Sequence, residues 1–312
     1  MRKAAWRDLA RATALALGLI AGASPAGAAE RLRAVATFSI LGDLVRQVGG
    51  DAVDVTTLVG PDADAHGYSP APGDSRMLAA AGIVFVNGLG FEGWLDRLIR
   101  ASGSKAPVVV ASAGVATVPA RHDHRHGEGG RAAAGAEADP HAWQSVPNAK
   151  VYVANIRNGL AKVDPAHAAD YTRNADAYLA KLDAVDSEIR AALARIPADH
   201  RKVITTHDAF GYFSAAYGLT FLAPQGVSTD SEASPQDVAQ IIRQVRRDKV
   251  PAVFIETIAD PRLMQQVSRE SGARIGDKVY SDALSRPAGP AATYLDMMRS
   301  NLRAFSAALG PT

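Results

Sequence analysis

The sequence predicts an α/β protein with two Rossmann-like lobes, each built on a parallel sheet, bridged by one long α-helix. Short β-branched, apolar segments alternate with helical patterns in residues 30–163 and again in residues 197–312. This alternation is typical of parallel sheets covered by helices on both faces. Between the two regions, residues 164–196 carry apolar side chains at steps of three and four, the spacing of one continuous amphipathic helix.

The N-terminal lobe, residues 30–163, is predicted from four strand-like segments with helical patterns between them. The strands are expected at 33–37, 53–59, 83–87 and 108–111, and the helical patterns at 40–48, 77–81 and 94–99. Residues 119–138 interrupt this order, because they are rich in His, Gly, Ala and charge and show no apolar period. We expect a His-rich surface loop there.

Two helices are predicted next, followed by the C-terminal lobe. The first helix covers 148–162, and the second begins near Pro165 and ends before Pro197, since proline favours the first turn and stops a helix later. In the C-terminal lobe, strands are expected at 202–206, 220–223, 252–256 and 278–281, and helices at 209–217, 235–247, 261–271 and 291–309.

Residues 1–29 have the pattern of a secretory signal peptide. A basic start is followed by an apolar stretch over 12–23 and by small residues before Ala28 and Ala29, where cleavage is expected. The alternative is an N-terminal membrane anchor, but the apolar stretch is too short to span a bilayer comfortably. The mature chain is therefore predicted to be exported, as a secreted or periplasmic protein.

Charge and cysteine content narrow the function classes. Residues 1–29 hold four of the 34 basic and one of the 32 acidic residues, so the remainder has 30 basic and 31 acidic residues. This balance predicts no binding to nucleic acid or to an anionic membrane. The chain has no cysteine, so we expect no disulfide, no thiolate ligand and no lipid anchor at the cleavage site. A monomer is expected.

Four residues far apart in the sequence are candidate metal ligands: His66, His141, His207 and Asp282. His207 and Asp282 directly follow predicted strands, and His66 lies in the loop after another. Ligands of open α/β sheets bind at the carboxyl ends of the strands, so this placement favours a shared site. Three imidazoles and one carboxylate form a closed tetrahedral set that suits Zn²⁺.

A second group of histidines, His122, His124 and His126, lies in the predicted surface loop. The functional interpretation is an auxiliary zinc site that captures or accepts the ion more weakly than the main site, because a flexible chain must be ordered on binding. The alternative is a passive, solvated tract, and the sequence leaves both open.

Around the four candidate ligands, the chain resembles the metal-binding lipoprotein/adhesin class of periplasmic solute-binding proteins, the zinc and manganese receptors of ABC importers. The resemblance rests on segments 60–70 (Gly-Pro-Asp-Ala-Asp-Ala-His-Gly-Tyr-Ser-Pro), 139–143 (Asp-Pro-His-Ala-Trp), 207–213 (His-Asp-Ala-Phe-Gly-Tyr-Phe) and 280–285 (Tyr-Ser-Asp-Ala-Leu-Ser). It implies a metal held between two lobes, an ABC permease in the inner membrane as partner, and no enzymatic activity.

The third ligand position bears on the choice of metal. Manganese relatives in this class tend to have a carboxylate there and zinc relatives a histidine, so His207 resembles the zinc branch; imidazole also favours zinc over the harder manganese ion. Two departures stand beside the ligands. Ala65 replaces a common proline, and Gln144, Ser145 and Val146 replace the usual acidic continuation.

The sequence therefore predicts a high-affinity periplasmic zinc receptor that delivers Zn²⁺ to an ABC importer. One alternative is a secreted zinc-dependent hydrolase, against which stand the fourth protein ligand and the lack of a His-Glu-x-x-His motif. Another is a periplasmic zinc chaperone, and a zinc-donating chaperone is also a candidate partner.

Several other side chains near these motifs have predicted roles. Glu256 is expected to hold a ligand histidine in one tautomer. Trp143 and Phe210 are expected to pack, His167 and His200 to be solvated, and Asp230 and Glu232 to be loop charges.

Overall fold

The computed structural model describes residues 31–120 and 137–310. The predicted signal peptide, residues 1–29, lies outside the described residues, as do His122, His124 and His126. The described residues from Leu32 onward form one compact unit. The division of that unit at residues 163 and 197 therefore stays a prediction.

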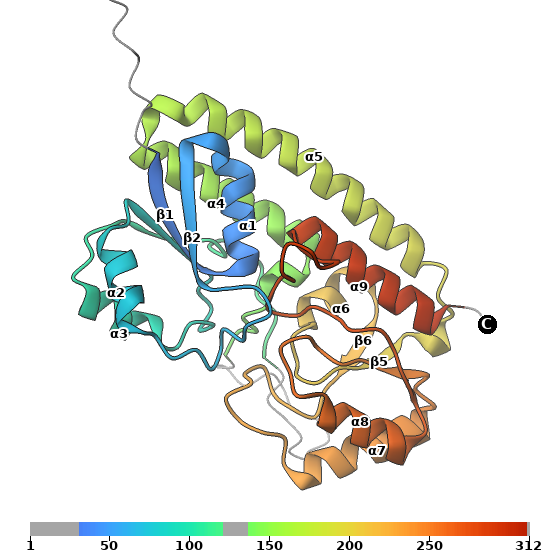
Figure 1. Ribbon diagram of the computed structural model, residues 1–312. Helices are drawn as coiled ribbons and strands as arrows, with labels where there is room; N and C mark the ends of the chain where they lie inside the picture. The colour runs from blue at the N-terminus through green and yellow to red at the C-terminus, as the bar shows by residue number, and fades with distance from the viewer. Residues whose placement is uncertain (1–30, 121–136, 311–312) are drawn as a thin grey trace, which may run out of the picture. The chain divides into compact units, whose positions relative to one another are not determined.

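The first half of the chain forms a parallel sheet with the strand order β2-β1-β3-β4 (Figure 1). The strands are β1 (Leu32–Phe38), β2 (Val53–Val59), β3 (Ile83–Val86) and β4 (Val108–Val110), and the helices are α1 (Ser39–Gly49), α2 (Pro72–Ala79) and α3 (Leu95–Ser102). A short 3₁₀ turn, η1 (Gly50–Ala52), leads from α1 into β2. Central strand β1 pairs Ala34 with Val55 on one side and with Ile83 on the other.

Two consecutive helices follow and connect the halves. They are α4 (Val146–Val163), preceded by η2 (Ala142–Gln144), and α5 (Ala168–Leu193), preceded by η3 (Pro165–His167). The 26 residues of α5 span about 39 Å. Helix α5 packs against α1 and α4 and also against the C-terminal helix α9 (Tyr294–Leu309), so it runs along both halves (Figure 1). Its buried residues follow the predicted three- and four-residue steps: Tyr171, Ala175, Tyr178, Leu182, Val185, Ile189 and Leu193.

The second half repeats the arrangement with the parallel strand order β6-β5-β7-β8. After η4 (Ala198–His200), its strands are β5 (Lys202–Ile204), β6 (Thr220–Leu222), β7 (Ala252–Val253) and β8 (Arg274–Ile275), and its helices are α6 (Gly211–Tyr217), α7 (Pro235–Asp248) and α8 (Pro261–Ser271). Helix α7 begins with a capping box, in which Ser234 and Asp237 satisfy each other's backbone N–H groups, and Pro235 occupies the first turn. The two α/β lobes and the long connecting helix confirm the predicted fold class.

The last strand was predicted wrongly. Strand β8 lies at Arg274–Ile275, whereas the expected strand at 278–281 contributes only an isolated bridge between Val279 and Glu256 in the described residues. The pairing ends after Val279 because the side chain of Asn301 binds both backbone groups of Tyr280: it accepts from the N–H at 2.8 Å and donates to the carbonyl at 2.8 Å. This extended segment therefore leads into the candidate site rather than along the sheet.

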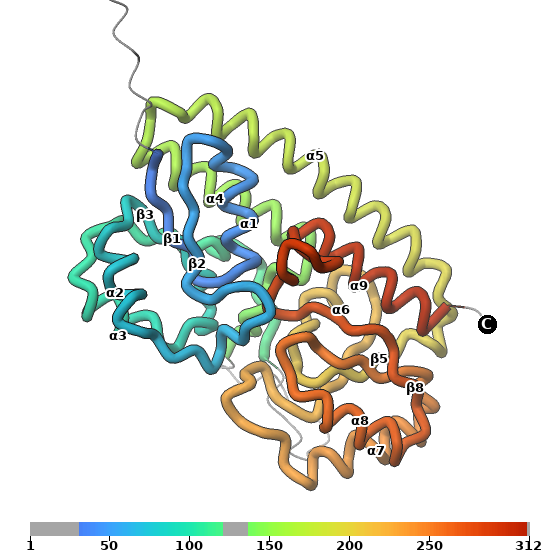
Figure 2. Tube along the Cα trace, in the orientation of Figure 1, coloured from blue at the N-terminus to red at the C-terminus, as the bar shows by residue number. Residues whose placement is uncertain are grey.

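The shared strand order places a switch point in each sheet, between β1 and β3 and between β5 and β7. Ligands of such sheets bind beyond the carboxyl ends of the strands at that point. Ser39 and Asn87 follow β1 and β3, whereas His207 and Glu256 follow β5 and β7. The Cα trace in Figure 2 shows the half that contains β1 and β3 next to the half that contains β5, with α5 running along both.

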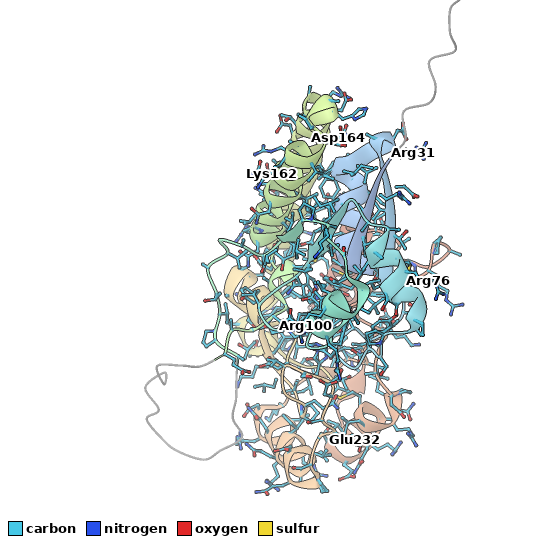
Figure 3. All side chains as sticks on the ribbon, turned by 90° about the vertical axis from the view of Figure 1, so that its left-hand side faces the viewer. Arg31, Arg76, Arg100, Lys162, Asp164 and Glu232 are labelled. Atoms are coloured by element: carbon cyan, nitrogen blue, oxygen red, sulfur yellow. The ribbon has the colours of Figure 1, made fainter. Side chains whose placement is uncertain are left out.

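Charged residues of both signs lie on the outside of the ribbon, Arg76, Arg100 and Glu232 among them (Figure 3). Within the described residues, no helix is both long enough and apolar enough to cross a membrane.

Candidate metal centre

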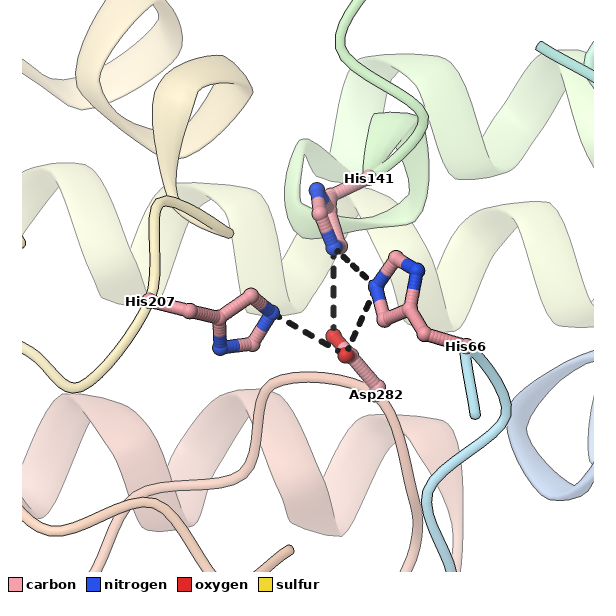
Figure 4. Close-up of side chains that lie close together, drawn as sticks. All are labelled: His66, His141, His207 and Asp282. Atoms are coloured by element: carbon pink, nitrogen blue, oxygen red, sulfur yellow. Dashed lines mark hydrogen bonds and ion pairs between the residues drawn. The ribbon is translucent and has the colours of Figure 1, made fainter. Parts of the chain in front are cut away.

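The structure brings the four predicted ligands together. His66, His141, His207 and Asp282 are all buried, and each offers a ligand atom within 4.8 Å of the others (Figure 4). His66 Nε2 lies 3.2 Å from His141 Nε2. The carboxylate of Asp282 lies 3.3, 3.5 and 3.1 Å from the Nε2 atoms of His66, His141 and His207. Two ligands come from each half of the chain.

His66 is positioned by a tight loop after β2. The side chain of Asp64 accepts the backbone N–H of His66 at 2.9 Å, which fixes a local Asx-type turn. The indole N–H of Trp94 donates to the carbonyl of Ala65 at 2.8 Å. Ala65 itself is fully buried. These contacts hold the loop around Ala65 in place.

His141 is fixed by its own carboxylate partner. Asp139 Oδ1 lies 2.7 Å from His141 Nδ1 and also accepts the backbone N–H of His141 at 2.9 Å. The side chain of Asn87, just after β3, donates to the carbonyl of Pro140 at 2.9 Å. A carboxylate on Nδ1 leaves Nε2 free for a metal. Sequence reasoning missed Asp139 and Asn87 as supports, although Asp139 lies in the Asp-Pro-His motif.

His207 has the predicted support from Glu256. Glu256 Oε2 lies 2.5 Å from His207 Nδ1, and Glu256 Oε1 accepts the backbone N–H of His207 at 2.9 Å. Phe210, three residues on, stacks on Phe221 with ring centroids 4.7 Å apart. Phe210 is a packing residue, as predicted.

Asp282 is held through the peptide that precedes it. The carbonyl of Ser281 accepts from the indole of Trp143 at 2.9 Å and from the amide of Gln144 at 2.6 Å. Trp143 therefore packs, as predicted, and also donates a hydrogen bond across more than one hundred residues of sequence. The departure from the family pattern at Gln144 has a structural role in this contact.

The four side chains point their lone pairs at a common centre. Both oxygens of Asp282 and Nε2 of His207 are buried and lack hydrogen-bond geometry to any described residue. Buried polar atoms normally have partners, and unpartnered ones are costly. A divalent cation at the centre would satisfy all of them at once.

The electrostatics of the metal-free protein show that protons compete for this centre. Burial disfavours the charged form of His141, but Asp282 and Asp139 outweigh this effect and raise the pKa of His141 to about 9. Burial also opposes charge on His207, yet Glu256 and Asp282 raise its pKa well above the usual value. Burial alone would raise the pKa of Asp282, but His207 and His141 lower it well below its usual range.

Two other histidines were predicted to be solvated, and the structure differs. His167 is half-buried with Nδ1 2.7 Å from Asp164 Oδ2, and His200 Nδ1 lies 3.2 Å from the carbonyl of Leu309. Both pair with nearby helix ends and lie outside the four-residue cluster. Glu232 lines a cavity beside the cluster, and Asp230 is exposed.

Comparison with known proteins identifies the family. The family described as "ZnuA: Zinc-uptake complex component A periplasmic" matches residues 34–308. The chain belongs to this family. It is therefore a metal-binding substrate-binding protein of an ABC metal importer and not an enzyme, which rules out the hydrolase alternative.

Individual relatives carry different metal names. The chain is 33% identical over 287 residues to the iron-binding protein YfeA of Yersinia pestis, covering 92% of this chain and 89% of YfeA. It is 34% identical over 280 residues to the manganese-binding lipoprotein MntA of Halalkalibacterium halodurans, covering 90% and 89%. Among solved structures, the periplasmic zinc-binding protein TroA of Treponema pallidum is 30% identical with a TM-score of 0.80, covering 90% of this chain and all of TroA.

These findings establish the functional class of the protein. The protein is a periplasmic or extracellular metal-binding receptor whose partner is the membrane permease of an ABC importer. The relatives agree on the class of protein and differ on the ion named.

Proposed function

We propose that this receptor captures Zn²⁺ through His66, His141, His207 and Asp282 and delivers it to its importer. The supporting observation is the buried set of three imidazoles and one carboxylate. In a tetrahedral zinc site with bonds of 2.0–2.1 Å, neighbouring ligand atoms are about 3.3 Å apart. The contacts among His66, His141 and Asp282 are 3.2, 3.3 and 3.5 Å.

Manganese or iron is the second candidate cargo, because both oxygens of Asp282 face the histidines. Oδ1 lies 3.5 Å from His141 Nε2, while Oδ2 lies 3.1 Å from His207 Nε2. A carboxylate that binds through both oxygens raises the coordination number and suits harder ions. The names of YfeA and MntA also favour this alternative.

A competition titration separates the two cargoes. The exported form of the wild-type protein is stripped of metal and titrated with Zn²⁺ or Mn²⁺ against a chelator of known affinity. We expect one tight Zn²⁺ per chain and much weaker Mn²⁺ binding. His141→Ala should weaken Zn²⁺ binding by more than about 100-fold, since loss of an outer support alone costs 10–100-fold. Asp282→Ala should weaken it less, because water can fill the open position.

His200→Ala is the matched control, since His200 lies outside the cluster and binds the carbonyl of Leu309. It should bind Zn²⁺ like the wild type. Tighter binding of Mn²⁺ than Zn²⁺ would replace zinc by the second candidate, and unchanged Zn²⁺ affinity in His141→Ala would remove the proposed site.

The remaining expectations belong to the same proposal. Cleavage near Ala28 or Ala29 releases a monomeric receptor. A zinc-donating chaperone passes Zn²⁺ to this receptor. Some relatives are lipoproteins by name, whereas this chain has no cysteine to carry a lipid, and we propose that it acts without an anchor. His122, His124 and His126 are proposed as an auxiliary zinc site, and the zinc chaperone remains the alternative function.

A further inference from the structure

The loop that carries His66 is held by segments from the second half of the chain on two sides. On one side, the backbone N–H of Asp62 donates to the carbonyl of Leu284 at 2.9 Å. On the other side, the hydroxyl of Thr229 donates to Asp64 Oδ2 at 2.6 Å. The second contact joins side chains 165 residues apart, and neither residue is a metal ligand.

Asp64 uses its two oxygens for two different tasks. Oδ2 accepts the hydroxyl of Thr229, whereas Oδ1 accepts the backbone N–H of His66 at 2.9 Å. The carboxylate therefore sets the turn that orients His66 and binds the opposite half of the chain at the same time. A hydrogen bond to a charged acceptor is stronger than one between neutral groups.

The segment carrying Thr229 is in turn tied to His207. The backbone N–H of Gln225 donates to the carbonyl of Thr206 at 3.3 Å, and the N–H of Asp208 donates to the carbonyl of Gly226 at 3.1 Å. Gln225 also forms a parallel bridge with His207. Residues 225–229 therefore connect the backbone around one ligand histidine to the turn that orients another.

Asp64 and Thr229 also line a cavity of about 480 Å³, to which Asp64 is the only contributor from the first half among the described lining residues. Thr206, the residue before His207, lines the same cavity. Separation of Thr229 from Asp64 would widen this cavity at Asp64 and would remove one restraint on the turn at His66. The four candidate ligands are buried and come from the two halves, so a contact that joins the halves beside them can affect access to the site.

We propose that the Asp64–Thr229 hydrogen bond is a latch that closes the two halves over the bound metal and slows its release. Thr229 and Asp64 act as positioning residues through His66 and His207. This inference rests on the proposed metal site. The latch affects the rate of dissociation more than the rate of association, because the bond must break before the buried ion can leave.

The test measures the release of Zn²⁺ from the loaded, exported form of the chain after mixing with excess chromogenic chelator. Thr229→Val keeps the shape of the side chain and removes the hydroxyl, so release should be about tenfold faster, as expected for loss of a hydrogen bond to a charged group. Thr229→Ser keeps the hydroxyl and should release at the wild-type rate. Thr220→Val is the matched control, because Thr220 is exposed on β6, and it should also match the wild type.

A double-mutant cycle shows whether the two residues act together. Asp64→Ala should accelerate release at least as much as Thr229→Val, since it also frees the turn at His66. Thr229→Val should then add nothing in the Asp64→Ala background, because coupled residues are not additive. The rate of Zn²⁺ association should be the same in Thr229→Val as in the wild type, which a merely structural role would not predict. Should Thr229→Val misfold, Thr229→Ala removes the same hydroxyl and must show the same acceleration.

Wild-type release rates in both Thr229→Val and Thr229→Ala would overturn the latch. It would also be overturned if Thr229→Val accelerated release in the Asp64→Ala background as much as it does alone. His141→Ala separates this failure from that of the proposed site. If His141→Ala loses Zn²⁺ while Thr229→Val releases it normally, only the latch is wrong. If His141→Ala retains Zn²⁺ like the wild type, the metal site itself is wrong.

Discussion

Glu256 binds His207 twice. One carboxylate oxygen lies 2.5 Å from the ring Nδ1, and the other accepts the backbone N–H of the same residue at 2.9 Å. Oε1 also accepts the N–H of Thr206 at 2.8 Å. Both the orientation of the ring and the position of its backbone are therefore set by one side chain at the end of β7.

The substitution Glu256→Gln should lower metal affinity by about 10–100-fold, the usual cost of losing a carboxylate partner of a ligand histidine. The glutamine amide has the size of the glutamate side chain but carries no negative charge to attract Nδ1 of the His207 ring. Chelator competition with Zn²⁺ measures the loss. Glu270→Gln, on the exposed end of α8, is the control and should have wild-type affinity. Equal affinities for the two variants would show that the ring is held by packing alone.

Metal binding near neutral pH should release protons. In the metal-free protein the pKa of His141 is raised to about 9 and that of His207 lies well above its usual value. The raised pKa values favour the protonated form of both rings near neutral pH, and a protonated ring cannot bind a metal. We expect about two protons released per Zn²⁺, measured by calorimetry in two buffers with different ionisation enthalpies. Release of fewer than one proton would contradict the raised pKa values.

The same shifts set the pH dependence of the metal-free fold. A histidine with a raised folded-state pKa stabilises the fold fully below its unfolded pKa of about 6.5. For His141 this contribution is lost as the pH rises through about 9. Asp282 has a lowered pKa, so its contribution is present above the unfolded value and is lost only in strong acid. The midpoint temperature of thermal unfolding without metal should therefore decrease as the pH is raised from 6.5 to 9. An increase of this temperature over that range would contradict the assignment.

Periodicity and strand order account for what could be predicted from the sequence. The buried face of α5 follows the apolar steps from Tyr171 to Leu193, because helix geometry is local. His207 is likewise predicted at the end of a strand, because the apolar segment directly before it is a local feature of the sequence. Asp282 was also found, although its preceding strand was not, since the extended segment after Val279 leads to the same place.

Contacts between the halves could not be predicted, because they depend on packing of distant segments. Nothing near Gln144 in the sequence indicates that its amide reaches the carbonyl of Ser281. Nothing near Thr229 indicates that its hydroxyl donates a hydrogen bond to Asp64. The two-residue strand β8 is too short to give a periodic signal. Family motifs marked the candidate ligands, but the residues that hold these side chains in place could be found only from the three-dimensional arrangement.

Removal of the metal should destabilise the protein markedly. A ligand that binds only the folded state at about 1,000 times its dissociation constant adds about 4 kcal/mol. For a chain of this size that corresponds to roughly 10 °C in the unfolding midpoint. Differential scanning calorimetry with and without Zn²⁺ measures the shift. The shift should persist in His200→Ala and disappear in His141→Ala; a shift that survives in His141→Ala would place the stabilising ion elsewhere.

Gln144 offers a way to separate positioning of Asp282 from folding. Its amide nitrogen donates to the carbonyl of Ser281 at 2.6 Å and lies 3.3 Å from the carbonyl of Tyr280. Both carbonyls keep another donor without it: Trp143 binds Ser281, and Asn301 binds Tyr280. The amide oxygen of Gln144 is buried with no partner among the described residues.

Gln144→Leu should therefore leave the metal-free fold nearly as stable as the wild type. It removes a costly unpartnered oxygen together with two hydrogen bonds, each worth about 1 kcal/mol, and both carbonyls keep another donor. The carbonyl of Ser281, directly before Asp282, would then keep only the hydrogen bond from Trp143 among the described residues. We expect Zn²⁺ affinity to fall by roughly three- to tenfold, the equivalent of about 1 kcal/mol. Chelator competition and thermal unfolding of the same samples measure the two effects, with Gln236→Leu on the exposed start of α7 as control. A large loss of stability, or an affinity equal to that of Gln236→Leu, would mean that Gln144 serves packing and does not position Asp282.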